Sequence, residues 1–387
     1  MAARVLLLSG SAGHGHVKAA EALLAAFQAR HPGLVVEHWD ALEHMPGWFR
    51  GVYRRGYVAL VDRFPGLWRR LYASTDRAHS WLGHRISRLA ARRLVRDVVA
   101  WQPDLVLCTH FLAPEVLSVA IERGRLDVPV EIVVTDHDAH RSWHWPRVSR
   151  AFVASQHVAG RFELKFGMPP SSLCVTGIPV REGFGTPRDL HAVRRRLGLS
   201  EQRPTVLFLS GGFAAAPFAE AIDALWRSRP DVQVLAVCGR NQRQQERVRA
   251  VTRPPGSVLH VLGFVEEIPD LMAVADVVVS KSGGITTSEC MAAGRPLLVS
   301  AHIAGQEERN ADAVAEAGAG ARGLSVDSLV SRLRVLLDDP AALAAMALAA
   351  RRMGRPDAAA CVVDDVAARV AARAEVPAPR EQDRTPA

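Results

Sequence analysis

The amino-acid sequence predicts an α/β protein built from two Rossmann-like, doubly wound domains. Its 387 residues are enough for two sizeable hydrophobic cores. Short apolar runs alternate with helical segments, which is the pattern of parallel sheets covered by helices. Three predicted strands are each followed by a glycine-rich turn and a helix: Val5–Leu8 in the first half, and Thr205–Ser210 and Val277–Ser280 in the second. Each half is therefore expected to fold as a domain of its own.

The first half contains the expected strands of one sheet. Val5–Leu8 is a continuous apolar run, as in a central parallel strand, and a helix is predicted over 17–30. Further strands are predicted at Leu34–His38, Asp104–Thr109, Glu131–Thr135 and Ala151–Ser155. Ligands of open α/β sheets bind beyond the carboxyl ends of the strands, which places Asp136 where chemistry is expected.

The second half repeats this plan after a segment rich in Gly, Pro and Arg, 182–199, that suits a hinge. Strands are predicted at Thr205–Ser210, Val232–Val237, Val258–Val261, Val277–Ser280 and Leu297–Val299. Helices are predicted over 218–227, 286–293, 327–337, 341–353 and 356–373. We therefore expect domains at 1–180 and 181–355, a C-terminal helix over 356–374 that returns to the first domain, and a disordered polar tail over 375–387.

Composition and charge limit the classes of function. Hydrophobic residues make up 49% and charged residues 23%, as in ordinary globular proteins. No apolar run reaches the length of a membrane span, and Val5–Leu8 is too short for a signal peptide, so a cytoplasmic protein is expected. Five scattered cysteines without a CxxC pair argue against a disulfide framework or a zinc site. A net charge of +8 favours an anionic partner, such as nucleic acid, anionic lipid or a phosphorylated metabolite.

The stretch Gly263–Asn310 predicts a nucleotide or nucleotide-sugar pocket. An apolar run leads into a glycine turn at 282–284 and then a helix, whose first N–H groups can bind a phosphate. Glu289 lies about one turn into that helix, where a carboxylate usually binds a ribose diol. A loop further on carries groups suited to sugar hydroxyls: Gln306, Glu307 and Asn310. The alternative is an ordinary strand–turn–helix unit whose glycines only make the turn.

Another glycine loop, at 9–16, contains His14 and His16. It matches neither the P-loop pattern nor a full GxGxxG, because the third glycine is missing. The positive end of a helix dipole disfavours a protonated imidazole, so a neutral histidine here can act as a general base. The alternative is that one or both histidines only cap or pack the turn.

Aromatic residues are interleaved with arginines between Trp48 and Arg96. This mixture suits a bilayer interface, where each arginine near an anionic surface contributes roughly 1 kcal/mol. Two alternatives stay open: ordinary helices with a solvated arginine face, and a nucleic-acid surface on which bases stack. The segment Asp136–His144 clusters a carboxylate with histidines, but its spacings match no standard metal motif, so no metal is expected.

The order of these motifs resembles glycosyltransferase family 28, which includes the diacylglycerol glycosyltransferases and the N-acetylglucosaminyl transferase that makes lipid II. GFV…IPDLMAVADVVVSKSGGITTSECMAAGRPLLV, closing on GQEERN, is similar to the donor-binding half of that family. In the first half, GHGHVKAAEAL is similar to its GxGHxxxAEAL motif, TDHDAHRSWHWP to a segment that begins with TD, and CVTGIPVR to the crossing between domains. The resemblance covers residues 4 to 372.

The resemblance implies the GT-B fold, two Rossmann-like domains that face a cleft. It implies an inverting glycosyltransferase that moves a hexose from a UDP-sugar to a lipid hydroxyl, on diacylglycerol or glycosyl-diacylglycerol. It also favours docking of residues 48–96 on the inner face of the cell membrane, with no nucleic-acid partner and no cofactor or metal. Transfer to a polyprenyl-linked or soluble hydrophobic acceptor stays open, as do a UDP-sugar epimerase on the same fold and a non-catalytic lipid or nucleic-acid binder.

The resemblance also implies roles for particular residues. His16 matches the family's histidine and is the expected base, while Asp136 either orients His16 or is itself the base. Arg309 departs from the family pattern, in which a small residue precedes the asparagine, so the loop shape and the choice of sugar stay open. The implied donor-binding residues are Gly211, Gly212, Phe264, Val265, Ser282, Gly283, Gly284, Thr286, Glu289, Gln306, Glu307, Asn310 and Arg181, the last of which could equally be a plain linker arginine. The implied acceptor or membrane residues are Trp48, Phe49, Tyr53, Tyr57, Trp68 and His14.

Overall fold

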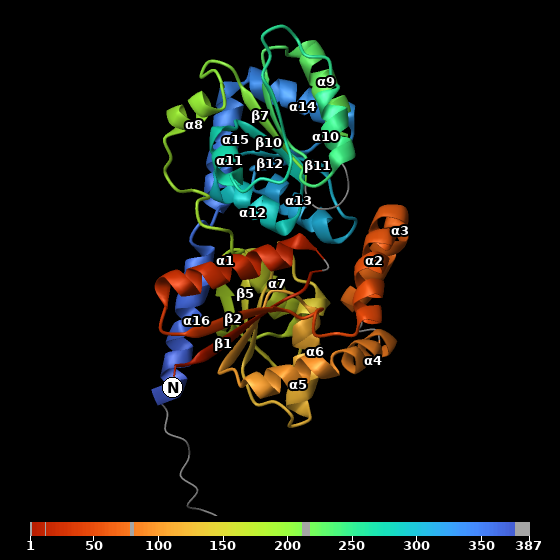
Figure 1. The fold of residues 1–387 in the computed structure, drawn as a ribbon, viewed down its shortest axis with the longest axis vertical. Coiled ribbons are helices and arrows are strands. Elements are labelled where there is room, and N and C mark those ends of the chain that lie inside the picture. The colour runs from red at the N-terminus through yellow and green to blue at the C-terminus, as the bar shows by residue number, and fades with distance from the viewer. Residues whose placement is uncertain (1, 12, 78–80, 211–216, 376–387) are drawn as a thin grey trace, which may run out of the picture.

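The computed structural model describes residues 2–11, 13–77, 81–210 and 217–375. They form two domains, each built on six parallel strands, with helices on both faces of each sheet (Figure 1). The first sheet has the order β2-β1-β3-β4-β5-β6. Its strands are β1 (Arg4–Ser9), β2 (Val35–Asp40), β3 (Leu105–Cys108), β4 (Val130–Val133), β5 (Val148–Val153) and β6 (Leu173–Val175).

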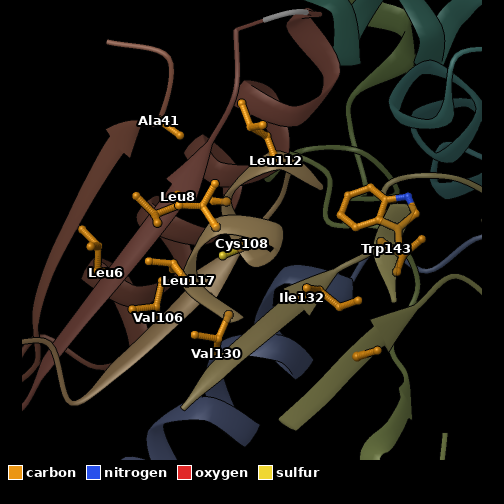
Figure 2. Packing of buried hydrophobic residues seen from close by; sticks show 14 of the residues in the cluster. Leu6, Leu8, Ala41, Val106, Cys108, Leu112, Leu117, Val130, Ile132 and Trp143 are labelled. Atoms are coloured by element: carbon orange, nitrogen blue, oxygen red, sulfur yellow. The ribbon is translucent and has the colours of Figure 1, made fainter. Parts of the chain in front are cut away.

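The apolar runs become central strands because both faces of the sheet are covered. In β1, Val5 and Leu7 pack toward one face while Leu6 and Leu8 pack toward the other, and all four are fully buried. Burial on both faces explains why Val5–Leu8 is a continuous apolar run rather than an alternating one. Figure 2 shows one of these faces, with Leu6, Leu8, Val106, Cys108, Val130 and Ile132 of three neighbouring strands beside Leu112 and Leu117 of a covering helix.

The segment between β2 and β3 is almost entirely helical. The sequence predicts an aromatic and arginine-rich surface there, with a pair of helices as the alternative, and the structure contains four helices. The helices of the first domain are α1 (His14–Arg30), α2 (Gly47–Arg63), α3 (Pro65–Arg77), α4 (Trp81–Ala90), α5 (Arg92–Trp101), α6 (Leu112–Glu122) and α7 (Gln156–Phe166), with short 3-10 turns η1 (Arg141–Trp143) and η2 (Pro170–Ser172). Helices α2 and α3 stand out from the sheet and rise beside the second domain (Figure 1).

The second sheet has the order β12-β11-β10-β7-β8-β9. Its strands are β7 (Thr205–Leu209), β8 (Gln233–Val237), β9 (Leu259–Leu262), β10 (Val277–Lys281), β11 (Leu297–Ala301) and β12 (Gly320–Arg322). Its helices are α8 (Leu190–Arg196), α9 (Phe218–Ser228), α10 (Gln242–Arg249), α11 (Ile268–Val274), α12 (Gly284–Ala292), α13 (Gln306–Glu316), α14 (Val326–Asp338) and α15 (Pro340–Met353).

One expectation about local structure is wrong. The sequence places Gln306, Glu307 and Asn310 in a loop, whereas all three lie in α13, which begins at Gln306. Gly305, with φ +83°, turns the chain just before the helix, in a conformation that favours glycine. The acidic residues Glu307 and Glu308 then lie in the first helical turn, where they complement the helix dipole.

The last described helix, α16 (Ala358–Glu375), lies against α1 and the first sheet (Figure 1). Asp364 on α16 accepts hydrogen bonds from Arg30 and His31. Arg369 pairs with Glu131 of β4, which is 1% exposed. The chain thus leaves the first domain, builds the second and returns. Among the described helices none is long and apolar enough to cross a membrane. Of the tail predicted over 375–387, Glu375 is the last residue of α16, and the rest lies outside the described residues.

The pairing of Arg369 with Glu131 predicts a measurable loss of stability when it is broken. Arg369→Met should lower the free energy of unfolding by about 3 kcal/mol, because the Glu131 carboxylate would stay buried without its partner. Urea denaturation of the full chain measures this difference. Arg373→Met, an exposed arginine on the same helix, is the control. Equal denaturation midpoints for both variants would contradict the prediction.

Candidate active site

A cavity of about 270 Å³ lies between the two domains, and we call it the cleft cavity. From the first domain it is lined by the loop between β1 and α1 and by the residues that follow β4. From the second domain it is lined by the start of α12, the start of α13 and the segment after β9. The carboxyl ends of both sheets therefore meet at this cavity, as expected for a ligand site in open α/β sheets.

A second cavity, of about 450 Å³, lies in the first domain beneath α2 and α3, and we call it the aromatic cavity. Its walls are mainly rings: Tyr53, Trp68, Tyr72, Phe111, Trp143 and Trp145. The two cavities share four residues: Gly13, His16, Asp136 and Gln306. A polar chamber and an apolar chamber thus meet at one histidine and one carboxylate.

His16 is held in one orientation by the first domain. Its Nδ1 lies 2.8 Å from the carbonyl oxygen of Thr109 and 2.9 Å from the hydroxyl of Thr135. Because a carbonyl only accepts, Nδ1 carries the proton and Nε2 keeps its lone pair. Burial lowers the pKa of His16 to about 4, so the ring is neutral at pH 7. Nδ1 donates to the carbonyl of Thr109, so the role of orienting His16, one of two expected for Asp136, belongs to threonines.

Asp136 is buried at the junction of the two cavities. Burial raises its pKa to about 6, against the effect of a hydrogen bond from Gln306 of the second domain. The Gln306 amide donates to the carboxylate at 3.2 Å. At pH 7 Asp136 is therefore mainly ionised and contacts a residue expected to bind the donor sugar. Asp138, two residues on, is paired with Arg161 at 2.8 Å and does not line either cavity.

The start of α12 lies against the first domain. Gly284 has no space for a side chain, because a Cβ there would be 1.9 Å from the carbonyl oxygen of Thr135. Gly283 and Thr286 line the cleft cavity beside it. The first N–H groups of α12 have no partner within their helix and are available to an anion at this place.

Glu289, one turn further along α12, also lines the cleft cavity. Burial raises its pKa to about 7, against the opposing effects of Arg181 and Lys18. Arg181 lines the same cavity. Phe264 and Val265 line the cavity as well, with Phe264 58% exposed and so open to stacking. Gly211 and Gly212 lie outside the described residues.

Three of the expected donor-binding residues make contacts within the protein instead. Glu307 lines the cleft cavity, but its carboxylate is paired with Lys281 and accepts the N–H of Ile303 at 2.8 Å. Ser282 is fully buried and donates to the carbonyl of Glu307. Asn310 is also fully buried, and its amide joins the N–H of His137 to the carbonyl of Ser282 at 2.7 and 3.0 Å. Ser282 and Asn310 therefore hold the domains and the loop in place.

The expected acceptor and membrane residues separate into different environments. Trp48 is 60% exposed, whereas Phe49 is 7% exposed and belongs to the core, so its expected place at the surface is wrong. The two residues are neighbours on α2 and point in different directions. Tyr53 and Trp68 line the aromatic cavity. The side chain of Tyr57 lies outside the described residues.

His14 and Arg309 also differ from their expected positions. His14 lines the cleft cavity rather than the aromatic one, and burial together with nearby cations lowers its pKa. Arg309 points away from the cleft cavity and is 56% exposed at its side chain, within 3.9 Å of Asp138 and 3.8 Å of Asp312. Its bulk therefore does not reshape the chamber in which a sugar would lie.

Sequence reasoning missed two lysines. Lysine occurs only at positions 18, 165 and 281, and Lys18 and Lys281 both line the cleft cavity. Because almost all of the positive charge is carried by arginine, the few lysine positions could have indicated residues of the cleft cavity. The rings of Phe111, Trp143 and Trp145 were also missed: Trp143 and Trp145 lie in the segment TDHDAHRSWHWP, but the sequence assigned no cavity to it.

Comparison with known proteins agrees with this arrangement. A family described as monogalactosyldiacylglycerol (MGDG) synthase matches residues 16–180, and the glycosyltransferase family 28 C-terminal domain matches residues 205–362. The chain is 32% identical over 382 residues to the monogalactosyldiacylglycerol synthase of Spinacia oleracea, which covers 94% of this chain and 72% of that protein. It is 28% identical over 348 residues to the processive diacylglycerol beta-glucosyltransferase of Staphylococcus carnosus, covering 89% and 87%.

Among solved structures, MurG of Acinetobacter baumannii superposes with a TM-score of 0.65 at 19% identity, covering 95% of this chain and 99% of that one. The fold, with two parallel-sheet domains and a cavity between them, is the GT-B fold, and the protein is a glycosyltransferase. The chain belongs to glycosyltransferase family 28, together with the monogalactosyldiacylglycerol synthases and the processive diacylglycerol glucosyltransferases.

The pKa of Glu289 predicts a pH dependence of UDP binding. The ionised carboxylate is the better acceptor for two ribose hydroxyls, and a pKa of about 7 means that it forms as the pH rises from 6 to 8. The affinity for UDP should therefore rise about fivefold or more over this range, as measured by isothermal titration calorimetry.

Glu289→Gln is the control for that experiment. The phosphate groups of UDP titrate equally in the measurements with the unaltered protein and with the variant, so a difference between the two profiles belongs to Glu289. The glutamine variant should bind UDP more weakly at pH 8 and lack the rise that belongs to Glu289. Identical pH profiles for both proteins would show that this carboxylate does not contact the nucleotide.

Proposed function

We propose that this protein is an inverting glycosyltransferase that moves a hexose from a UDP-sugar to the free hydroxyl of diacylglycerol or glycosyl-diacylglycerol. The observation that carries the proposal is the meeting of the cleft cavity and the aromatic cavity at His16 and Asp136. The named relatives act on diacylglycerol, and one of them makes a β-glucoside. Making a β-linkage from an α-linked UDP-sugar requires inversion at the anomeric carbon.

The cleft cavity suits the donor. The start of α12 supplies N–H groups for the diphosphate, and Lys18, Lys281 and Arg181 add positive charge around the same chamber. Phe264 suits the face of the uracil, and Glu289 the ribose. Gln306, next to the Asp136 carboxylate, suits the sugar. We propose that these fixed charges stabilise the departing UDP without a metal ion.

Glu307 supports this donor site indirectly. Its carboxylate is nearly buried, and it holds the ammonium group of Lys281 beside the glycine turn at the start of α12. A cation paired in this way keeps one position without reorganisation as negative charge develops on the leaving group. We therefore propose that Glu307 positions Lys281 and does not bind the sugar hydroxyls.

The chemistry follows from the tautomer of His16. The neutral ring has its Nε2 lone pair available at the junction, where an acceptor hydroxyl from the aromatic cavity would meet the anomeric carbon. Nε2 takes the proton as the hydroxyl oxygen attacks, and the bond to the UDP oxygen breaks on the opposite face. The ionised Asp136 stabilises the positive charge that develops beside it. The hydrogen bond that Nδ1 donates to the Thr109 carbonyl keeps the imidazole aligned.

The aromatic cavity suits the lipid acceptor. Val52 and Leu71 line it and are also 68% and 42% exposed, so the cavity opens at an outer face of α2 and α3. Further large apolar side chains are exposed on α2, α3 and α4 and at the residue that joins α2 to α3: Trp48, Phe64, Leu67, Ile86 and Leu89. A UDP-sugar epimerase would need neither this cavity nor this face.

We propose that this apolar face, consisting of Trp48, Val52, Phe64, Leu67, Leu71, Ile86 and Leu89, rests on a bilayer. Exposed arginines such as Arg63 and Arg70 lie on the same helices and suit anionic headgroups. The lipid hydroxyl would then pass from the bilayer to His16 through the aromatic cavity. The inner face of the cell membrane remains a prediction from the sequence.

Product formation tests the proposed reaction. The protein is incubated with diacylglycerol in anionic vesicles and with radiolabelled UDP-glucose, UDP-galactose or UDP-N-acetylglucosamine. We expect labelled glycolipid from at least one donor. His16→Ala should lower the rate by about 100-fold or more because the general base is lost. UDP affinity should change by less than about twofold, because His16 does not contact the nucleotide in this proposal.

His157→Ala, an exposed histidine of the same domain, is the matched control and should retain the rate. Absence of lipid product from all three donors would overturn the assignment to diacylglycerol. A normal rate in His16→Ala would overturn its role as the base.

Vesicle flotation tests the apolar face. The double variant Trp48→Ser and Leu67→Ser should lower the affinity for anionic vesicles by roughly tenfold, because two exposed apolar side chains no longer enter the interface. Neither residue lines a cavity, so UDP affinity should not change. Val335→Ser, a 65% exposed residue on α14 of the second domain, is the control. Equal flotation of both variants would place the membrane contact elsewhere.

A further inference from the structure

Helix α3 belongs to the first domain but also contacts the second. The ring of Tyr72 rests against the backbone of Gly305, where a Cβ would lie only 2.7 Å from the ring carbon Cδ1. Arg69, one turn earlier, donates to Glu308 of α13 at 2.5 Å. Figure 1 shows α3 rising beside the second domain. The helix that carries part of the apolar face is thus also a contact between the domains.

The same helix forms a wall of the aromatic cavity. Trp68, Leu71, Tyr72 and Thr75 all line it. The ring of Tyr72 stacks on His140 with 4.1 Å between ring centres, and Nε2 of His140 donates to the Tyr72 carbonyl at 3.1 Å. Any molecule that fills the aromatic cavity therefore lies against Tyr72.

The C-terminal end of α3 is fixed to the first domain. The carboxylate of Asp76 accepts from Lys165 at 2.5 Å and from the backbone N–H of Arg141 at 3.0 Å. Earlier on the helix, Leu67 is 51% exposed on the apolar face. Helix α3 is thus anchored at its C-terminal end by Asp76. Its earlier part carries the exposed Leu67.

Gly305 is the residue directly before Gln306. Gln306 begins α13, lines both cavities and donates to the Asp136 carboxylate. The position of Gly305 therefore decides where the Gln306 side chain lies. Tyr72 therefore lines the aromatic cavity and also contacts Gly305, the residue next to Gln306.

We propose that Tyr72, supported by the ion pair of Arg69 with Glu308, is a positioning residue that couples the two substrates. A lipid in the aromatic cavity seats Tyr72 against Gly305, and this holds Gln306 against Asp136 in the arrangement that binds the donor. Filling the aromatic cavity thus strengthens binding in the cleft cavity, and the reverse holds by thermodynamic reciprocity. The inference rests on the proposed function, because it assumes a lipid acceptor in one cavity and a UDP-sugar in the other.

The test is the affinity for UDP, which binds without turnover. It is measured by calorimetry with anionic vesicles that contain diacylglycerol and with the same vesicles lacking it. For the unaltered protein we expect UDP to bind about five- to tenfold more tightly when diacylglycerol is present. Tyr72→Ala should lose this difference, while its UDP affinity on vesicles without diacylglycerol stays within about twofold of the unaltered protein.

Further variants separate coupling from general damage. Tyr72→Phe keeps the ring and should keep the difference. Arg69→Glu should reduce it, and the combined exchange Arg69→Glu with Glu308→Arg should restore it. Arg334→Glu, at an exposed arginine on α14 of the second domain, changes the charge by the same amount as Arg69→Glu and should leave the difference unchanged.

The outcomes discriminate between this inference and the proposed function. If the unaltered protein binds UDP equally on both kinds of vesicle, or if Tyr72→Ala retains the difference, the coupling is overturned while the transferase assignment stands. If UDP does not bind at all, the proposed function fails and the coupling fails with it.

Discussion

The cleft depends on one close contact between the domains, the backbone of Gly284 against the carbonyl of Thr135. There is no space for a side chain there, so only glycine lets the start of α12 reach the residues that follow β4. The fully buried amide of Asn310 secures the same interface by bridging His137 and Ser282. Asp136 and the anion-binding turn become neighbours through this contact. The groups that we propose for catalysis and for donor binding are thereby brought from two separate folding units into one chamber.

Burial at this interface also sets the protonation states. It lowers the pKa of His16 and raises those of Asp136 and Glu289, because the charged form of each loses hydration. A neutral imidazole and a mainly ionised carboxylate therefore stand together near neutral pH, which suits a base and a group that stabilises its charge. The lysines and Arg181 concentrate positive charge on the donor side of the same chamber.

The first domain differs in character from the second, and the difference follows from helices α2, α3 and α4. They cover an apolar chamber that opens between exposed hydrophobic side chains, whereas the cleft cavity is lined by glycine turns, carboxylates and cations. A lipid and a nucleotide sugar need these opposite environments. The two chambers share Gly13, His16, Asp136 and Gln306, so in the proposed reaction transfer takes place at one point and the acyl chains stay away from the charged donor.

The sequence by itself determined the strand–turn–helix units, the two domains and the family, because apolar runs and glycine turns are local signals and the motif residues are adjacent in the chain. It also indicated His16, Asp136 and Glu289. Only the tertiary structure decided which motif side chains reach the cavity: Ser282 and Asn310 turn inward, and Glu307 pairs with Lys281. The sequence named Tyr53 and Trp68 for the acceptor, but it did not show the aromatic cavity. Most of its lining comes from residues 52–75 and 110–145, which come together when α3 packs over η1. The direction of a side chain depends on where its helix begins and on how distant elements pack against it. Neither can be predicted from a local sequence pattern.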